Sequence, residues 1–163
     1  MSPPIFELET ILRQLIDEHG RLLKHVEAQQ AAMKAFDLKG MDEAAKSQDA
    51  CRLRVASLET KRRAAVAQIA RQHRMATMPT LGQLADMLPQ KRAALLKLRD
   101  ELKAAVASLS ARTHVAGRLA GAISGHLTTV VRLLAGAVER AGIYTKDGVP
   151  RVSNRIGVME AVG

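Results

Sequence analysis

The sequence of 163 residues is almost without aromatic side chains: it has no Trp, one Tyr and two Phe. Strands are enriched in aromatic and β-branched residues, whereas Ala, Leu, Gln, Arg and Lys, which are plentiful here, favour helices. A content of 47% hydrophobic and 25% charged residues is typical of a globular chain rather than a disordered one. We therefore expect an all-α fold.

Cysteine is equally scarce, because Cys51 stands alone and has no partner for an internal disulfide. The N-terminus lacks the basic flank and apolar run of a signal peptide. Together these features favour a reducing compartment, and we expect a cytoplasmic protein.

Motifs that carry chemistry are also missing. No two of the five histidines are three or four residues apart, no zinc signature occurs, and no nucleophile motif or Gly-rich phosphate loop can be found. The sequence thus predicts no metal, no cofactor and no catalytic residue, which argues against an enzyme. His19 falls on an apolar helical seam, where we expect a partly buried packing residue.

What the sequence does contain is helical periodicity. Between Leu8 and Phe36 apolar residues alternate at spacings of four and three, which predicts one long helix from near Pro3 to a break at Lys39-Gly40. A second helix is expected from an N-cap at Asp42 to about residue 77. The short connection makes these two helices antiparallel neighbours.

The second half of the chain adds a short and a long helix. Residues 80–83 (Thr-Leu-Gly-Gln) have the form of a capping box, which predicts a short helix over 81–88. Pro89 then opens the longest predicted helix, which runs to about Ala141 before Gly142. We expect an elongated antiparallel bundle of three long helices and one linker helix with coiled-coil-like packing. Its domain spans 1–142, and an extended or mobile tail spans 143–163.

Charge is unevenly distributed along the chain. Residues 1–50 carry 6 Lys/Arg against 9 Asp/Glu, a net of −3, whereas residues 51–163 carry 19 against 7, a net of +12. The densest basic stretch comprises Arg52, Arg54, Lys61, Arg62, Arg63, Arg71 and Arg74. These residues point around much of their helix and no aromatic residue is interleaved for base stacking, so a nucleic-acid-binding bundle is only an alternative.

The last long helix changes character along its length. Leaving aside Leu96, the large apolar residues between Leu95 and Leu109 fall within an arc of roughly 80°, enough for one neighbouring helix. The arc widens to roughly 160° between Leu119 and Val138. We interpret the wider part as a groove for a partner's amphipathic helix, and the alternative is burial against the first two helices. The predicted binding residues are Leu119, Ile123, Leu127, Val130 and Leu134.

Gly117, Gly121 and Gly125 recur at every fourth position along the opposite margin of this arc. In lipid that spacing favours close helix dimerisation, but Arg118, His126 and Arg132 interrupt the segment, so we expect no membrane insertion. Close approach by another helix is the preferred interpretation. A coiled-coil adapter that self-associates weakly through this face is a further alternative.

The order and spacing of these elements resemble the FlgN family of flagellar export chaperones over about residues 5–148. Leu58-Glu59 followed by Arg62-Arg63 is similar to a pattern in the family's second helix, and residues 79–89 and 97–102 resemble its linker helix and the start of its last helix. Residues 144–148 (Tyr-Thr-Lys-Asp-Gly) resemble its Tyr-x-x-x-Gly ending.

The resemblance implies a chaperone that protects hook-filament junction proteins in the cytoplasm and delivers them to type III export. Its clients would be hook-associated proteins, whose disordered terminal segments order on binding. By the same analogy Tyr144 and Gly148 would dock the chaperone on an export-gate component. A C-terminal cap packed on the last helix is the alternative role for Tyr144.

Overall fold

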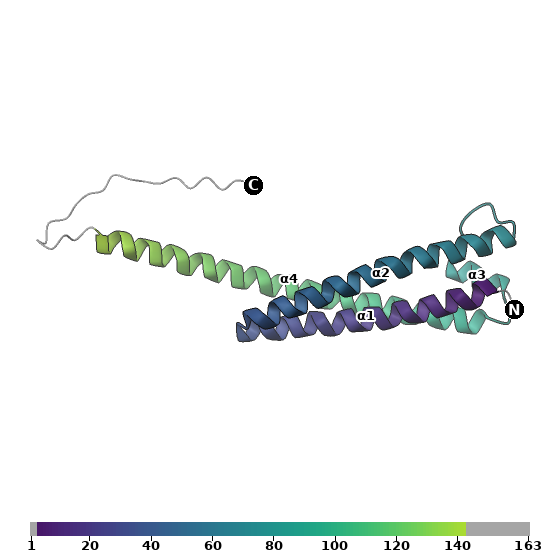
Figure 1. The fold of residues 1–163 in the computed structure, drawn as a ribbon, viewed down its shortest axis with the longest axis horizontal. Helices are drawn as coiled ribbons and strands as arrows, with labels where there is room; N and C mark the ends of the chain where they lie inside the picture. The colour runs from purple at the N-terminus through teal and green to yellow at the C-terminus, as the bar shows by residue number, and fades with distance from the viewer. Residues whose placement is uncertain (1–2, 143–163) are drawn as a thin grey trace, which may run out of the picture. The chain divides into compact units, whose positions relative to one another are not determined.

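In the computed structural model, residues 3–142 are described, with side chains over 4–137. They form four helices and no strand: α1 (Pro3–Ala35), α2 (Leu38–Gln72), α3 (Leu81–Met87) and α4 (Arg92–Gly142), as Figure 1 shows. The all-α class with three long helices and a short one is therefore confirmed. The chain divides into two compact units, Met1–Ala120 and Gly121–Gly163, so that α4 contributes to both.

The first unit is held together by the apolar seam of α1. Leu8, Leu12 and Leu15 are fully buried, and α2 packs along α1 through Leu58, Val66 and other buried residues. The core also takes Leu84 and Ala85 from α3, and Leu95 and Leu98 from the start of α4. The spacings of three and four along α1 place these leucines on one side of the helix, which explains why two neighbours can cover them.

The hairpin between α1 and α2 lies earlier than the sequence indicated. The expected stop at Lys39-Gly40 is wrong, because α1 ends at Ala35 and α2 begins at Leu38. Asp37, not Asp42, is the N-cap: its carboxylate accepts a hydrogen bond of 3.0 Å from the Gly40 amide. A Cβ at Gly40 would lie 2.5 Å from Asp37 Oδ2 and 3.2 Å from Ala32 Cβ, so the capping carboxylate would have to shift.

A Schellman motif terminates α1. The amide of Asp37 donates to the carbonyl of Ala32 (2.9 Å) and that of Phe36 donates to Met33 (3.2 Å). Phe36 takes the left-handed conformation, with φ 54°, that such a motif requires, although glycine usually occupies this place. Its side chain is 71% exposed. The predicted extension of the seam to Phe36 is therefore wrong.

Other helix boundaries also differ from those expected. α2 ends at Gln72 rather than near residue 77, because Arg74 adopts a φ of 52° and Met75 donates to the carbonyl of Ala70 (2.9 Å). The capping box of α3 is confirmed, with Thr80 and Gln83 exchanging side-chain and backbone hydrogen bonds. α4 begins at Arg92 instead of Pro89, after a turn in which Arg92 donates to Pro89. The predicted tail, 143–163, lies outside the described residues.

Candidate functional site in the last helix

The C-terminal part of α4 presents apolar side chains that the described residues leave uncovered. Leu127, Val130 and Leu134 are 58%, 50% and 61% exposed, while Leu119 and Ile123 are half-buried. At about 100° per residue all five fall within an arc of roughly 80° on one side of the helix. We call these five residues the α4 apolar face.

Two neighbours widen this surface. Val131 and Leu133 are each 63% exposed and flank the α4 apolar face on either side. The predicted binding residues did not include them, although the width of the apolar arc was a signal for both. With these two residues the apolar arc reaches roughly 160°. A helix that contacts a single neighbour needs a narrower arc.

The last contacts of α4 with α1 lie just before the α4 apolar face, although Val106 and Val115 are already 45% and 41% exposed. Gln30 donates from its side-chain amide to the carbonyl oxygen of Arg112 (2.8 Å), and Arg112 lies 3.5 Å from Glu27. Ala116 is the last buried residue of α4, and every described side chain after it is half-buried or exposed. The α4 apolar face thus begins just beyond the helix's last contacts with α1.

The electrostatics around the α4 apolar face are one-sided. No Asp or Glu occurs between Glu101 and Glu139, whereas Arg118 and Arg132 are exposed and form no ion pair within the described part of the chain. Polar groups there are satisfied locally, since Thr128 and Thr129 donate to carbonyls one turn back at 3.0 Å. Both arginines lie on the far side of α4, about 140° and 180° round the helix from the centre of the face. The face therefore suits an apolar segment, and no nearby Asp or Glu would repel acidic residues that such a segment carries.

The glycines of α4 do not mark close packing inside the described structure. A Cβ added at Gly117, Gly121 or Gly125 would meet no atom within 4 Å. No helix among residues 3–142 therefore approaches them closely. Approach by a helix of another molecule stays a prediction.

Length and composition alone would allow α4 to cross a membrane. One 18-residue window reaches a mean hydropathy of 1.2 with no more than two charged residues, and none of that window is buried. The sequence predicts that Arg118 and Arg132 make this helix too polar for a membrane. By mean hydropathy they do not. A single such helix is weak evidence for a membrane span.

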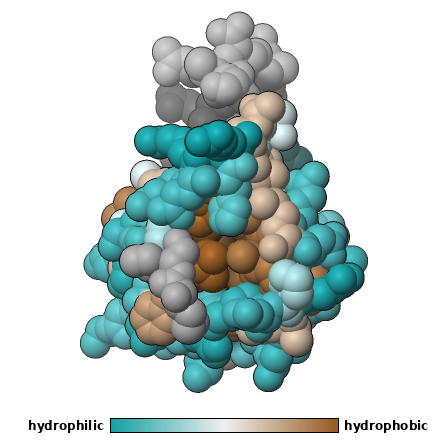
Figure 2. All heavy atoms as spheres, turned by 90° about the vertical axis from the view of Figure 1, so that its right-hand side faces the viewer, coloured by the Kyte–Doolittle hydropathy of each residue, from teal (hydrophilic) through white to brown (hydrophobic). Residues whose placement is uncertain are grey.

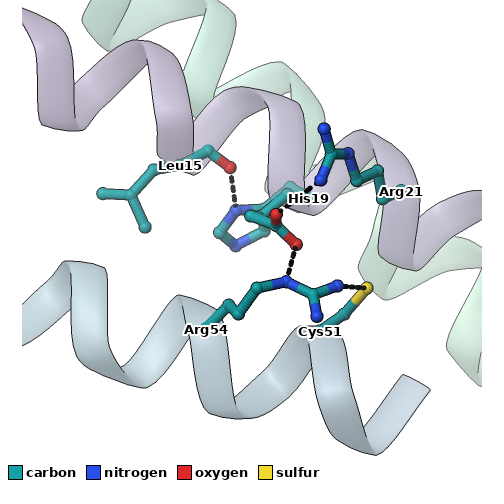
Figure 3. A network of polar contacts seen from close by, with 6 residues as sticks. Leu15, His19, Arg21, Cys51 and Arg54 are labelled. Carbon is teal, nitrogen blue, oxygen red and sulfur yellow. Dashed lines mark hydrogen bonds and ion pairs between the residues drawn. The ribbon is translucent and has the colours of Figure 1, made fainter. Parts of the chain in front are cut away.

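The polar residues singled out in the first two helices have structural partners. His19 is half-buried, and its Nδ1 lies 2.7 Å from the carbonyl oxygen of Leu15 in its own helix (Figure 3). Beside it Glu18, which is 7% exposed, accepts hydrogen bonds of 3.0 Å from Arg21 and Arg54. The bond to Glu18 raises the pKa of the Arg54 guanidinium above its ordinary value. Arg54 also donates to buried Cys51 (3.1 Å).

The basic stretch of α2 is partly neutralised by carboxylates. Arg52 pairs with Asp49, Arg54 with Glu18 and Arg62 with Glu59, at 2.9–3.0 Å. These pairs reduce the number of cations that could contact phosphates. Among the described residues no three His, Cys, Asp or Glu side chains are grouped so that they could hold a metal ion. The predicted docking residues Tyr144 and Gly148 lie outside the described residues.

Comparison with known proteins gives one match. The family model described as "FlgN protein" matches residues 1–151. Neither the curated proteins nor the solved structures contain a match. FlgN proteins are flagellar export chaperones, generally soluble and cytoplasmic, and they are not an enzyme family. Because the match spans most of the 163 residues, the chain belongs to the FlgN family.

Proposed function

We propose that this chaperone binds disordered terminal segments of hook-associated proteins on the α4 apolar face, protects them in the cytoplasm and delivers them to the type III export apparatus. One observation carries the proposal: Leu127, Val130 and Leu134 lie on one side of α4 and are at least half exposed. A client segment with an apolar face can cover them as an amphipathic helix covers a groove.

The energetics favour binding that is firm and still reversible. Fully burying one exposed Leu or Val side chain contributes roughly 1.5–3 kcal/mol. A disordered segment must spend about 2–5 kcal/mol of its gross interaction energy on becoming ordered. Several such contacts therefore outweigh the ordering cost, while the remainder stays small enough for the client to leave at the export apparatus. No nucleotide is needed on the chaperone for this cycle.

Charged substitutions on the α4 apolar face test the proposal. In the variant Val130→Asp/Leu134→Asp, two carboxylates would have to be desolvated in the complex, so co-purification with the terminal segment of a hook-associated protein should fall at least tenfold. Thr128→Asp is the matched control, because Thr128 is exposed about 140° round the helix from the centre of the face. Circular dichroism should show both proteins folded. Unchanged client binding by the double variant would refute the assignment.

Because α4 is long and apolar enough to enter a membrane, a second experiment tests whether lipid covers the α4 apolar face. Wild-type protein mixed with vesicles of phosphatidylethanolamine and phosphatidylglycerol should remain in the supernatant after centrifugation. Sedimentation with the vesicles, abolished by Val130→Asp/Leu134→Asp, would instead assign the α4 apolar face to lipid.

Docking on the export apparatus is assigned to the ending that contains Tyr144 and Gly148, on the strength of the family resemblance. The expected phenotype of Tyr144→Ala is a chaperone that binds its client as well as wild type but exports less of it. Loss of both properties together would contradict a separate docking role.

A further inference from the structure

A second uncovered apolar surface lies in the first unit, where the chain passes between α2, α3 and α4. A hollow of about 720 Å³ is lined by Ile5, His73, Met87, Leu88, Pro89, Gln90 and Lys91. Figure 2 looks onto this end of the first unit and shows hydrophobic surface gathered at its centre within a hydrophilic surround. The hollow shares no residue with the α4 apolar face.

Local structure explains why the hollow exists. The last helical residue of α3, Met87, is 38% exposed, and Leu88 follows it as C-cap with a non-helical backbone (φ −124°, ψ 75°). Residues 88–91 then turn, with Lys91 donating from its amide to Leu88 (2.9 Å), before α4 starts. Ile5 of α1 is 7% exposed and belongs to the core. The hollow is thus an opening toward the core that the described side chains around these short connections leave uncovered.

An ion pair fixes the connection that forms one wall. Lys91 Nζ lies 3.0 Å from Oε1 and 3.2 Å from Oε2 of Glu9, whose side chain is only 10% exposed. A lysine held by a buried carboxylate keeps residues 88–91 on α1. The wall is therefore preformed, which lowers the ordering cost for anything that binds there.

The charges at the hollow favour an acidic partner. Its lining contains His73 and no Asp or Glu, while the charge of Lys91 is already balanced by Glu9. In the last turn of α2 and just after it, Arg71 and Arg74 are exposed and make no ion pair within the described ranges. Asp86 nearby is already paired with Arg92 (3.2 Å). Glu7 lies about 200° round α1 from Ile5, on another side of that helix.

From these observations we propose that the hollow is a docking site for an amphipathic helix of a partner protein, whose apolar side chains enter beside Met87 while its Asp or Glu residues meet Arg71 and Arg74. A volume of about 720 Å³ falls within the range of roughly 300–1,000 Å³ found for ligand sites in proteins. The site is separate from client binding and provides the chaperone with a second protein contact.

The test uses the full chain carrying Val130→Asp/Leu134→Asp, so that binding at the α4 apolar face does not contribute and the failure of either proposal can be recognised separately. The probe is a fluorescein-labelled synthetic helix of 18 residues, with Leu at alternating spacings of three and four and Glu on its other faces. Fluorescence anisotropy should show binding of this peptide. A peptide with Lys in place of every Glu should bind at least tenfold more weakly, because it meets like charge.

Two substitutions locate the binding. Met87→Glu places a carboxylate in the lining and should weaken the acidic peptide about tenfold, whereas Met78→Glu, at a methionine that is 55% exposed and does not line the hollow, should leave it unchanged. Gln90→Glu adds one charge without changing size and should weaken binding about threefold, with Gln14→Glu on α1 as its control.

Three results would overturn the proposal. The first is the absence of binding by the acidic peptide, and the second is equal binding to the Met87→Glu and Met78→Glu proteins. The third is a dimer of the chain in light scattering that Met87→Glu dissociates, since the occupant would then be a second copy of this protein.

Discussion

Glu9 and Lys91 form an ion pair across 82 positions of sequence, and Gln30 reaches the carbonyl of Arg112 across the same separation. Two contacts with one offset mean that α4 runs parallel to α1 in a constant register. In that register the last residue of α1, Ala35, comes level with Gly117, and Ala116 is the last buried residue of α4 among those whose side chains are described, up to 137. The register therefore places the α4 apolar face, which starts at Leu119, beyond the end of α1.

Removing the cation of this pair should destabilise the first unit. Lys91→Met leaves the Glu9 carboxylate, which is 10% exposed, without its counter-charge. A fully buried charge deprived of its partner costs about 3–5 kcal/mol, but Lys91 is 27% exposed and water screens the pair, so we expect a loss of about 1–2 kcal/mol. Urea unfolding followed by circular dichroism measures it.

Lys97→Met serves as the matched control, because Lys97 is 77% exposed and lies 3.8 Å from Glu101 on the same helix. It should change the free energy of unfolding by less than about 0.5 kcal/mol. Adding Glu9→Gln to Lys91→Met should restore most of the stability, since no buried charge then remains. Equal effects of the two lysine substitutions would show that the Glu9 pair has no special role.

Most of the architecture was accessible from sequence because it depends on periodicity. The spacing of Leu8, Leu12 and Leu15 predicts a buried seam, and all three are fully buried. The capping box of α3 was recognisable because Thr80 and Gln83 stand at the spacing that the motif needs. The same reasoning placed Leu127, Val130 and Leu134 on one side of α4, where they are found.

Helix ends and long-range pairs were not accessible in this way. Glycine favours the left-handed position that ends a helix, which makes Gly40 the expected stop, yet Phe36 occupies that position. Residue propensity gives the wrong position because the hydrogen bonds that end α1 hold Phe36 in a left-handed conformation that a residue other than glycine rarely adopts. Ile5, His73 and Met87 meet around one hollow only because of how the connections fold, and no local pattern reports such a meeting.

Replacing Phe36 by glycine should stabilise the hairpin. A left-handed conformation costs a residue other than glycine about 1–2 kcal/mol, and Phe36 is 71% exposed, so little burial is lost with its side chain. Because glycine also loses more conformational freedom on folding, we expect Phe36→Gly to raise the free energy of unfolding by about 1 kcal/mol. Chemical denaturation measures the change.

Phe36→Ala separates strain from side-chain loss, because alanine retains the unfavourable φ and removes the ring. It should be less stable than Phe36→Gly by about 1 kcal/mol. If the alanine variant is as stable as the glycine variant or more stable, the left-handed conformation at position 36 is not a source of strain.

The glycines of α4 distinguish a client-binding chaperone from an adapter that self-associates. A Cβ at Gly121 or Gly125 would meet nothing within 4 Å, so Gly121→Ala/Gly125→Ala should raise the helicity of α4 and stabilise it by about 0.5–1 kcal/mol per residue. Light scattering should show the same mass for this variant as for wild type. Gly40→Ala is the opposing control and should destabilise, because its Cβ would lie 2.5 Å from Asp37 Oδ2. If wild type is an oligomer that the double alanine variant dissociates, helices of two molecules approach at these glycines, and the adapter is then the better account of α4.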